Sequence, residues 1–435
     1  MRASSRLGAL VLLLGTSQPL VGQDLSGLTP PGELRPSFNC PGFDNENPRP
    51  IETVRYLSDD SLQGRFAGSS GEVCAGDYIA TRFAALGLEP AGDDGFFQEL
   101  DLASVTQPHA PAGTGRNVIA MLRGADTDLS GSVVVIGAHY DHLGFGEFGS
   151  TGETGEIHNG ADDNASGVAA MLEAAKILSA GPPPARSILF IAFTGEELGL
   201  IGSSYYARNP TVSLARTLAM VNLDMVGRLN DEAMIVYGMG TAPEWETLIP
   251  EANEGLDIPL AYEDAGYGPS DHTSFYAADV PVLHFFTNVH RDYHRDTDDW
   301  EFIDEEGLGR IASFTANVAD LLANRPTRLT VIPGVGEPGD RAGGYGAWLG
   351  TVPDFTPVDK GVLLAGVTAG SPAAEAELQK GDILLGIGEH SVDDLQGMTD
   401  ALAKHAPGQQ VEITFLRDEA RMTTTARLGD RADRP

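Results

Sequence analysis

Apolar and polar stretches alternate along residues 51–322 in a way that predicts a layered α/β domain. Short apolar runs, rich in branched and aromatic residues, have the length and composition of buried strands. Between them lie segments whose apolar residues have the spacing of amphipathic helices. The expected strands cover 117–122, 132–137, 187–193, 217–225, 233–237 and 280–286, and the expected helices cover 51–58, 75–86, 164–178, 196–207, 244–253 and 304–322. Strands that alternate with helices predict a mostly parallel central sheet sandwiched by helices.

The pattern changes after residue 330. Residues 331–346 are rich in Gly and Pro, which is typical of a linker. Residues 347–430 contain short strand-like runs, turn signals and one helical stretch near 395–404. We therefore expect a main domain over 24–330, a linker over 331–346 and a separate, small β-rich domain over 347–430.

Residues 1–23 have the layout of a secretory signal peptide. Arg2 and Arg6 precede an apolar core at 7–14, which is too short to span a bilayer. We expect cleavage near Gly22 or Gln23 and an exported protein, either periplasmic or extracellular. The alternative is a retained interfacial anchor. We expect no transmembrane span elsewhere in the sequence.

The chain is strongly acidic. Its 62 Asp and Glu residues outnumber its 28 Lys and Arg residues, which gives a formal net charge of -34. The absence of a basic patch that would release counterions argues against binding to nucleic acid. Cys40 and Cys74 lack the CxxC spacing and the partners of a zinc site, and in an exported protein they could form one disulfide.

Polar side chains follow one expected strand after another. Because the carboxyl ends of parallel strands meet at one edge of a sheet, where open α/β folds bind ligands, these side chains should converge. They are His139 and Asp141, Asp162 and Asp163, Glu196 and Glu197, Asp224, and His294. Taken singly, each could serve an ordinary structural purpose, such as helix capping or turn formation. Together, the histidines and carboxylates form a ligand set suited to a pair of divalent metals, zinc first.

A series of motifs makes this pattern specific. They are HxD at 139–141, GADDNASG at 160–167, GEELG at 195–199, NLDM at 222–225 and YHxxxD at 293–298. With them in this order, the chain resembles the co-catalytic di-zinc aminopeptidases of the aminopeptidase S, aminopeptidase Y and bacterial leucyl aminopeptidase type. The resemblance implies the phosphorylase/hydrolase-like zinc exopeptidase fold. It also implies two Zn2+ per chain, with Mn2+ or Co2+ as substitutes.

The same resemblance implies a role for each polar residue. One carboxylate should bridge the two metals, and two further residues should complete each metal site. The bridge would be Asp162, and the completing pairs would be His139 with Asp224 and Glu197 with His294. Glu196 would be the general base that acts on the metal-bound water. Asp141 would hold the His139 imidazole in its liganding tautomer.

Two tyrosines are candidates for stabilising the oxyanion. Tyr267, in GYGPSDH, matches the tyrosine that one branch of the family uses, and Tyr293 matches the tyrosine of another branch. Both stay open, with Tyr267 ranked ahead. The resemblance implies a supporting role for Asp271 and His272. Four further histidines are expected outside the metal set, and they are His142, His158, His284 and His290.

The segment SPAAEAELQKGDILLGIGEHSV, in the C-terminal domain, resembles the PDZ domains found on bacterial proteases. Such domains bind extended C-terminal peptides by strand addition. The candidate carboxylate-binding loop, 348–351, departs from the usual Gly-Leu-Gly-Phe, so a scaffold role is the alternative.

The sequence as a whole predicts an exported metallo-exopeptidase, most simply an aminopeptidase acting on peptides with a free N-terminus. A carboxypeptidase or dipeptidase of the same fold is one alternative. A non-catalytic, PDZ-led binding protein is another, and the complete ligand set with Glu196 argues against it.

Overall fold

The computed structural model describes two parts of the chain, a larger first part and a smaller C-terminal part. The described residues are 40–42, 47–102, 113–146, 149–230, 232–335 and 347–430, the last range without 355–357, 359, 369, 393–397, 399–400, 403 and 418–419. The expected signal peptide at 1–23 lies outside them. Within these ranges, every helix is too short or too polar to cross a membrane.

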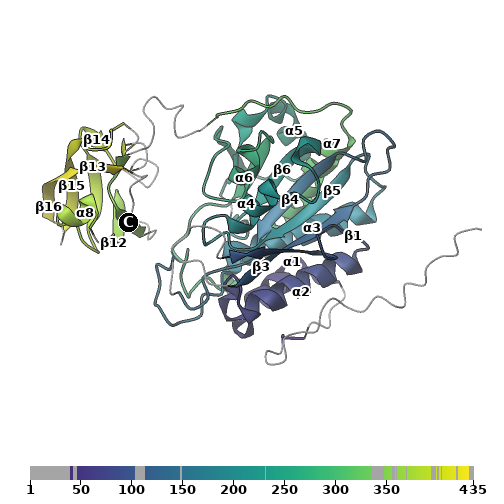
Figure 1. Cartoon of the computed structure of the whole chain (residues 1–435), viewed down its shortest axis with the longest axis horizontal. Helices are drawn as coiled ribbons and strands as arrows, with labels where there is room; N and C mark the ends of the chain where they lie inside the picture. The colour runs from purple at the N-terminus through teal and green to yellow at the C-terminus, as the bar shows by residue number, and fades with distance from the viewer. Residues whose placement is uncertain are drawn as a thin grey trace, which may run out of the picture. The chain divides into compact units, whose positions relative to one another are not determined.

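A nine-stranded mixed sheet forms the centre of the first part (Figure 1). Its strand order is β1-β3-β5-β4-β6-β9-β7-β8, and β2 pairs with β3. The strands are β1 Glu89–Pro90, β2 Phe97–Asp101, β3 Thr114–Leu122, β4 Val133–His139, β5 Ser187–Phe193, β6 Thr217–Leu223, β7 Met234–Tyr237, β8 Leu260–Tyr262 and β9 Val282–Phe286. The four central strands, β5, β4, β6 and β9, run parallel, while β3 joins β5 and β7 joins β9 in antiparallel pairs.

Strands β4, β5 and β6 are buried along their whole length. They therefore show continuous apolar runs rather than an alternating pattern, as expected for strands covered on both faces. The expected strand at 187–193 coincides with β5 residue for residue. The prediction of an α/β sheet with parallel central strands is confirmed, whereas the antiparallel outer strands were not predicted.

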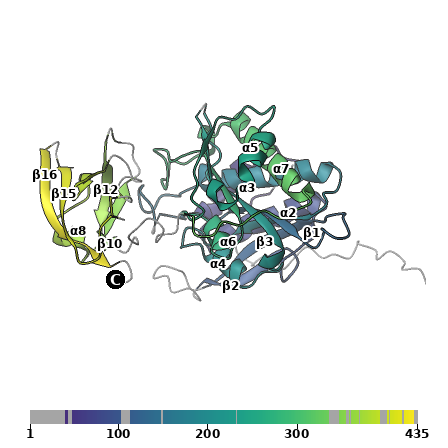
Figure 2. The same cartoon turned by 90° about the horizontal axis from the view of Figure 1, so that it is seen from above.

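Helices cover both faces of this sheet (Figures 1 and 2). On one face, Phe83 of α2 packs against Phe190 and Phe314 of α7 packs against Phe285. On the other face, Phe275 of α6 packs against Phe193 of the sheet. The helices are α1 Pro50–Leu57, α2 Ser70–Ala85, α3 Gly167–Ala180, α4 Ile201–Arg208, α5 Trp245–Ala252, α6 His272–Tyr276 and α7 Glu305–Asn324.

Two local predictions differ from the structure. The helix expected from residue 196 begins only at Ile201, because Gly195, Gly199 and Leu200 have positive φ angles of 65°, 103° and 60°. This tight turn keeps Glu196 and Glu197 out of a helix and at the end of β5. The SDH segment, expected as a loop, instead opens the short helix α6.

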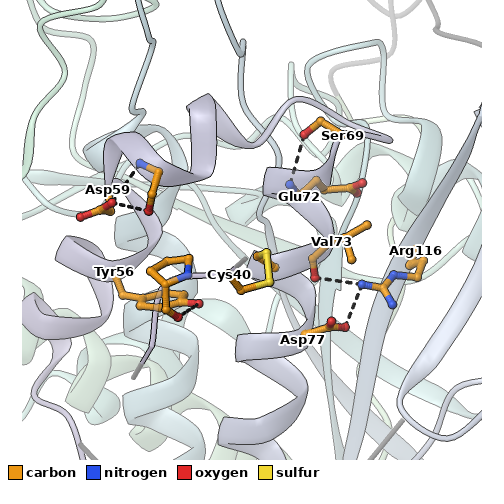
Figure 3. Close-up of a disulfide and its surroundings, with 11 residues drawn as sticks. Cys40, Tyr56, Asp59, Ser69, Glu72, Val73, Asp77 and Arg116 are labelled. Carbon is orange, nitrogen blue, oxygen red and sulfur yellow. Dashed lines mark hydrogen bonds and ion pairs between the residues drawn. A yellow bond between two sulfur atoms is a disulfide. The ribbon is translucent and has the colours of Figure 1, made fainter. Parts of the chain in front are cut away.

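Cys40 and Cys74 form a disulfide with their Cα atoms 5.4 Å apart, as Figure 3 shows. The bond joins the segment before α1 to helix α2. Arg116 of β3 donates hydrogen bonds to the carbonyl of Val73 and to Asp77 on the same helix, at 2.9 Å each. Helix α2 is therefore fixed covalently on one side and by a partly buried ion pair on the other.

The second part has its own apolar core, built from strands and one short helix. Its six-stranded sheet has the order β11-β12-β13-β15-β16, with β14 paired to β13, while β10 pairs with β17. The elements are β10 Ala347–Trp348, β11 Thr351–Asp354, β12 Val362–Val367, α8 Pro372–Glu375, β13 Ile383–Ile387, β14 His390–Ser391, β15 Gln410–Arg417, β16 Ala420–Arg427 and β17 Gly429–Asp430. Most of the helix expected near 395–404 lies outside the described residues.

Candidate metal centre

The parallel register of the central strands brings the candidate side chains to one edge of the sheet. His139, the last residue of β4, is aligned with Phe193, the last residue of β5. Leu223 at the end of β6 is aligned with Phe285 of β9. The loops that carry Glu196, Glu197, Asp224 and His294 therefore leave the sheet side by side.

Asp163 lies between two histidines that come from different loops. Its Oδ1 is 3.3 Å from His139 Nε2, and its Oδ2 is 3.2 Å from His294 Nε2. Asp224 Oδ1 lies 3.4 Å from His139 Nε2, and Glu197 Oε2 lies 3.2 Å from His294 Nε2. The arrangement has two halves that share one carboxylate, which is the layout that the sequence predicted for a two-metal site.

The expectation that Asp162 is the shared carboxylate is wrong. Asp162 Oδ1 accepts a hydrogen bond from the Gly227 N–H at 2.7 Å, and its Oδ2 lies 3.1 Å from His290 Nε2. Asp163 has an extended backbone, with φ -104° and ψ 91°, and the Asp163–Asn164 peptide bond is cis. The two neighbouring carboxylates therefore have different partners, and only that of Asp163 lies between His139 and His294.

Asp298, the last residue of the YHxxxD motif, holds this turn in place. Its Oδ2 accepts the backbone N–H groups of Asp162 at 2.9 Å and Asp163 at 3.0 Å. Arg228 donates to its Oδ1 at 2.7 Å. Asp298 ends the YHxxxD motif, but the sequence analysis assigned it no role, and no sequence signal indicated which backbone groups it would bind.

Asp141 links the two ends of the cluster. Its Oδ1 lies 3.7 Å from His139 Nδ1 and accepts the backbone N–H of Glu196 at 3.1 Å. The carboxylate is fully buried. The hydrogen-bond partner of His139 Nδ1 is the main-chain carbonyl of Asp141, at 3.3 Å, rather than its carboxylate, and the bond to Glu196 adds a contact that the sequence did not reveal.

His142 belongs to the surroundings of the cluster, although the sequence placed it among the uninvolved histidines. Its Nδ1 donates to Glu197 Oε1 at 2.7 Å, and its ring is buried. His158 and His284 lie elsewhere: His158 Nε2 is 2.7 Å from Ser150 Oγ, and the His284 ring stacks on His272 at 4.4 Å. The HYDH spacing could have signalled His142.

The two candidate tyrosines have different surroundings. Tyr293 stacks on His294, with ring centroids 3.9 Å apart. Burial raises the pKa of Tyr293 well above its usual value, and the charges of Asp163 and Glu197 raise it further. Tyr267 packs edge-on against Tyr276, with centroids 4.8 Å apart. The stacking on His294 favours Tyr293 over Tyr267 as the candidate for stabilising the oxyanion.

The pKa values of the two adjacent glutamates, Glu196 and Glu197, are shifted in opposite directions. Burial raises the pKa of Glu196 well above its usual range, and the charge of Glu197 raises it further. Burial would also raise the pKa of Glu197, but His294 and His142 lower it to about 2. Burial likewise opposes ionisation of Asp163, yet its contacts with His139 and His294 hold its pKa well below the usual value. Glu196 therefore favours the proton, and Glu197 and Asp163 favour the charge.

The donor set fits divalent cations. Within the described residues, the groups that could hold a metal are His139 with Asp163 and Asp224, His142 with Asp163 and Glu197, and His139 with Glu196 and Glu197. Several carboxylates share this small buried region with few cationic groups, which is costly unless positive charge balances them. Imidazole nitrogen and carboxylate oxygen are common zinc ligands.

Curated relatives match part of the chain. The leupeptin-inactivating enzyme 1 of Streptomyces exfoliatus is 36% identical over 178 residues, which cover 40% of this chain and 36% of that enzyme. Aminopeptidase YwaD of Bacillus subtilis is 32% identical over 186 residues, which cover 40% of this chain and 38% of YwaD. The chain thus spans less than half the length of these relatives.

Solved structures share the fold of this chain over more than half of its length. The zinc aminopeptidase BSAP from Bacillus subtilis has a TM-score of 0.51 at 20% identity, covering 64% of this chain and 95% of BSAP. Glutaminyl cyclase from Porphyromonas gingivalis has a TM-score of 0.52 at 19% identity, covering 62% of this chain and 96% of the cyclase. The fold alone therefore does not separate a peptidase from a cyclase.

Family models cover both domains. Residues 117–319 match the model of peptidase family M28, and residues 353–428 match the PDZ domain. The first range contains Asp163, Asp298 and the other residues of the acidic cluster. The chain is thus similar to peptidase family M28 over the first range and to the PDZ domain over the second.

Proposed function

We propose that this protein is a zinc-dependent aminopeptidase that removes N-terminal residues from peptides. The observation that carries the proposal is the position of Asp163, whose two oxygens lie 3.3 Å from His139 Nε2 and 3.2 Å from His294 Nε2. A carboxylate shared by two half-sites is the arrangement expected for two neighbouring divalent ions. Relatives named as aminopeptidases support the choice of reaction.

Two zinc ions would be held by five residues of this chain. Asp163 would be the shared ligand, His139 and Asp224 would complete one site, and Glu197 and His294 would complete the other. Bound there, zinc would supply Lewis-acid polarisation of the scissile carbonyl and make water a better nucleophile at neutral pH. The remaining steps depend on the protein side chains.

Glu196 is the group that moves the proton. Glu196 stands beside Glu197 after the end of β5, and an ionised carboxylate there can accept a proton from water and return it to the leaving amine. Its backbone N–H is held by Asp141, which also lies beside the His139 ring. Asp141 therefore fixes the base relative to one of the ligands. Tyr293, next to His294, would donate a hydrogen bond to the developing oxyanion.

The PDZ domain would bring a second peptide-binding surface. Strand β11 stands at one end of its six-stranded sheet, directly after Trp348, Leu349 and Gly350. Strand addition at such an edge is how PDZ domains take extended C-terminal peptides. Pro353 lies within β11 and lacks an N–H donor, so we expect weaker binding than a fully paired edge would give.

Export completes the proposal. The N-terminal sequence has the layout of a signal peptide, and Cys40 and Cys74 are bonded to each other, as is common in oxidising compartments. A relative from Mycobacterium tuberculosis is described as a probable lipoprotein aminopeptidase. Periplasmic or extracellular peptides with a free N-terminus would then be the substrates.

A panel of aminoacyl-p-nitroanilides, assayed with and without a chelator, tests the proposed activity. We expect release that the chelator stops and zinc restores, and no release by Glu196→Gln. Blocked peptides, dipeptides and peptides cut from the C-terminus form the second panel. Cleavage confined to that panel would replace the aminopeptidase with a carboxypeptidase or dipeptidase, and no cleavage in either panel would leave a binding protein.

A further inference from the structure

The turn at residues 63–65 has an unusual backbone. Gln63, Gly64 and Arg65 have φ angles of 50°, 66° and 48°, so three successive residues are left-handed. Residues other than glycine rarely adopt this conformation, and it persists only where the surroundings impose it. From the sequence, LQGRFAG was simply a loop. Its contacts show what holds it.

The backbone of this turn is docked onto the loop that follows β4. His142 N–H donates to the Arg65 carbonyl at 3.3 Å, and Gly144 N–H donates to the Gly64 carbonyl at 3.1 Å. A Cβ atom on Gly64 would lie 2.5 Å from the His158 carbonyl oxygen and 2.6 Å from that of Gly144. The turn therefore fits against two segments of this loop, at Gly144 and His158, only because residue 64 has no side chain.

The Arg65 side chain continues the same contact into the interior. It is fully buried. Its Nε donates to the carbonyl of Tyr140 at 2.9 Å, and its two terminal nitrogens donate to the carbonyls of Asn159 at 2.7 Å and Gly160 at 3.0 Å. One of them also donates to the Leu57 carbonyl. A planar guanidinium, with its several N–H groups in a fixed arrangement, is needed to donate to all of these carbonyls at the same time.

The carbonyls that Arg65 binds belong to the loops that carry the proposed ligands. Tyr140 stands directly after His139, and Asn159 and Gly160 lead into the turn that presents Asp163. Burial lowers the pKa of Arg65 to about 10, while the charges of Asp141 and Asp163 oppose that shift, so the group is cationic at neutral pH. The Arg65 side chain thus places a positive charge near the acidic cluster and holds the backbone segments at Tyr140 and Asn159–Gly160 at a defined distance from each other.

We infer that Arg65 is a positioning residue of the metal centre, which sets the spacing between the His139 loop and the Asp163 turn. The inference rests on the proposed function only for the existence of the metal site. Lysine at position 65 keeps the charge but cannot bind the carbonyls of both loops. The spacing between the two half-sites should then relax, and zinc should bind less tightly.

The first test compares Arg65→Lys with Arg186→Lys. Arg186 is also buried, at 2% exposure, and also donates to backbone carbonyls, those of Leu322, Ala323, Arg325 and Pro326, which are remote in sequence from the proposed ligands. Zinc affinity is measured by chelator competition on the zinc-free full-length protein, together with its unfolding temperature. We expect about a 10- to 100-fold loss of zinc affinity in Arg65→Lys. We expect the parent affinity, within about twofold, in Arg186→Lys.

A second pair of variants covers the case in which Arg65→Lys does not fold. Gly64→Ala and Gly87→Ala both place a side chain on a left-handed residue, with φ of 66° and 74°, but only the Cβ at position 64 meets neighbouring atoms. Zinc affinity should fall in Gly64→Ala and stay unchanged in Gly87→Ala.

The outcomes separate the two proposals. A parent protein that binds no zinc would overturn the proposed function. A parent that binds zinc, with equal affinity in Arg65→Lys and Gly64→Ala, would overturn only the positioning role. Equal losses of zinc affinity in Arg65→Lys and Arg186→Lys would show that the loss reflects lower protein stability, and would overturn the positioning role of Arg65.

Discussion

Asp141 accepts the backbone N–H of Glu196 through Oδ1, at 3.1 Å, although the two residues follow different strands of the sheet. The proposed base is therefore held by its main chain, which leaves its carboxylate free to exchange a proton. This arrangement leads to a simple expectation for the side chain of Glu196 itself.

Replacing Glu196 with Gln should remove turnover without removing zinc. The amide has nearly the same shape but cannot accept the proton, and general base catalysis contributes about 10²- to 10⁴-fold. We expect kcat to fall by at least that factor, with the zinc content unchanged. Elemental analysis of the purified variant beside its kcat checks the result, and loss of zinc together with activity would make Glu196 a ligand.

The neighbouring aspartates should respond differently to amide substitution. Asp163→Asn places a poor ligand between His139 and His294, and we expect zinc affinity to fall by at least about 100-fold. Asp162→Asn keeps an oxygen that can accept from Gly227 N–H, so its affinity should stay within about tenfold of the parent. Chelator competition measures both. The reverse order would restore Asp162 as the shared ligand.

Removing the Tyr293 hydroxyl should slow the chemical step. One donor to an oxyanion contributes about 10²- to 10³-fold to kcat, and Tyr293→Phe keeps the ring that stacks on His294. Tyr267→Phe, whose ring packs on Tyr276, is the matched control and should keep kcat within about threefold. A larger loss in Tyr267→Phe would reverse the assignment.

Glu72 should make the folded protein less stable as the pH rises. Burial raises its pKa to about 7, from an ordinary value of 4.5, although bonds from Thr194 and Gly68 work against this. The folded state therefore holds its proton more tightly than the unfolded state, and stability declines between about pH 4.5 and pH 7. The full shift corresponds to ~3 kcal/mol.

Glu72→Gln isolates this effect, since the amide does not titrate. Urea unfolding of the zinc-free protein at pH 5 and pH 8, for parent and variant, gives the difference directly. We expect the parent to lose ~3 kcal/mol more than the variant over this interval. Parallel declines in the two proteins would assign the pH dependence to other groups.

The sequence predicted those features that depend on local pattern. Strand β5 was predicted to the residue because an uninterrupted apolar run of this length, rich in branched and aromatic residues, favours a buried strand. The parallel order of the central strands then brought His139, Glu197 and His294 to one edge. The order and spacing of the motifs were sufficient to predict which loops form the cluster.

The choice between Asp162 and Asp163 could not be predicted in the same way. It depends on the backbone of one turn, whose two N–H groups are bound by Asp298, 136 and 135 residues further along the chain. Arg65 was missed for a related reason, since its partners are main-chain carbonyls, which every residue possesses. Long-range contacts to the backbone leave little trace in a single sequence.

The candidate ligands come from loops spread along the domain, and only the completed sheet brings them together. A ligand that binds the folded state alone stabilises it in proportion to the logarithm of its concentration. Zinc would then act on the protein's lifetime as well as on its catalysis. In a zinc-poor environment the folded state would be less stable, so the supply of metal would also affect how much folded protein is present.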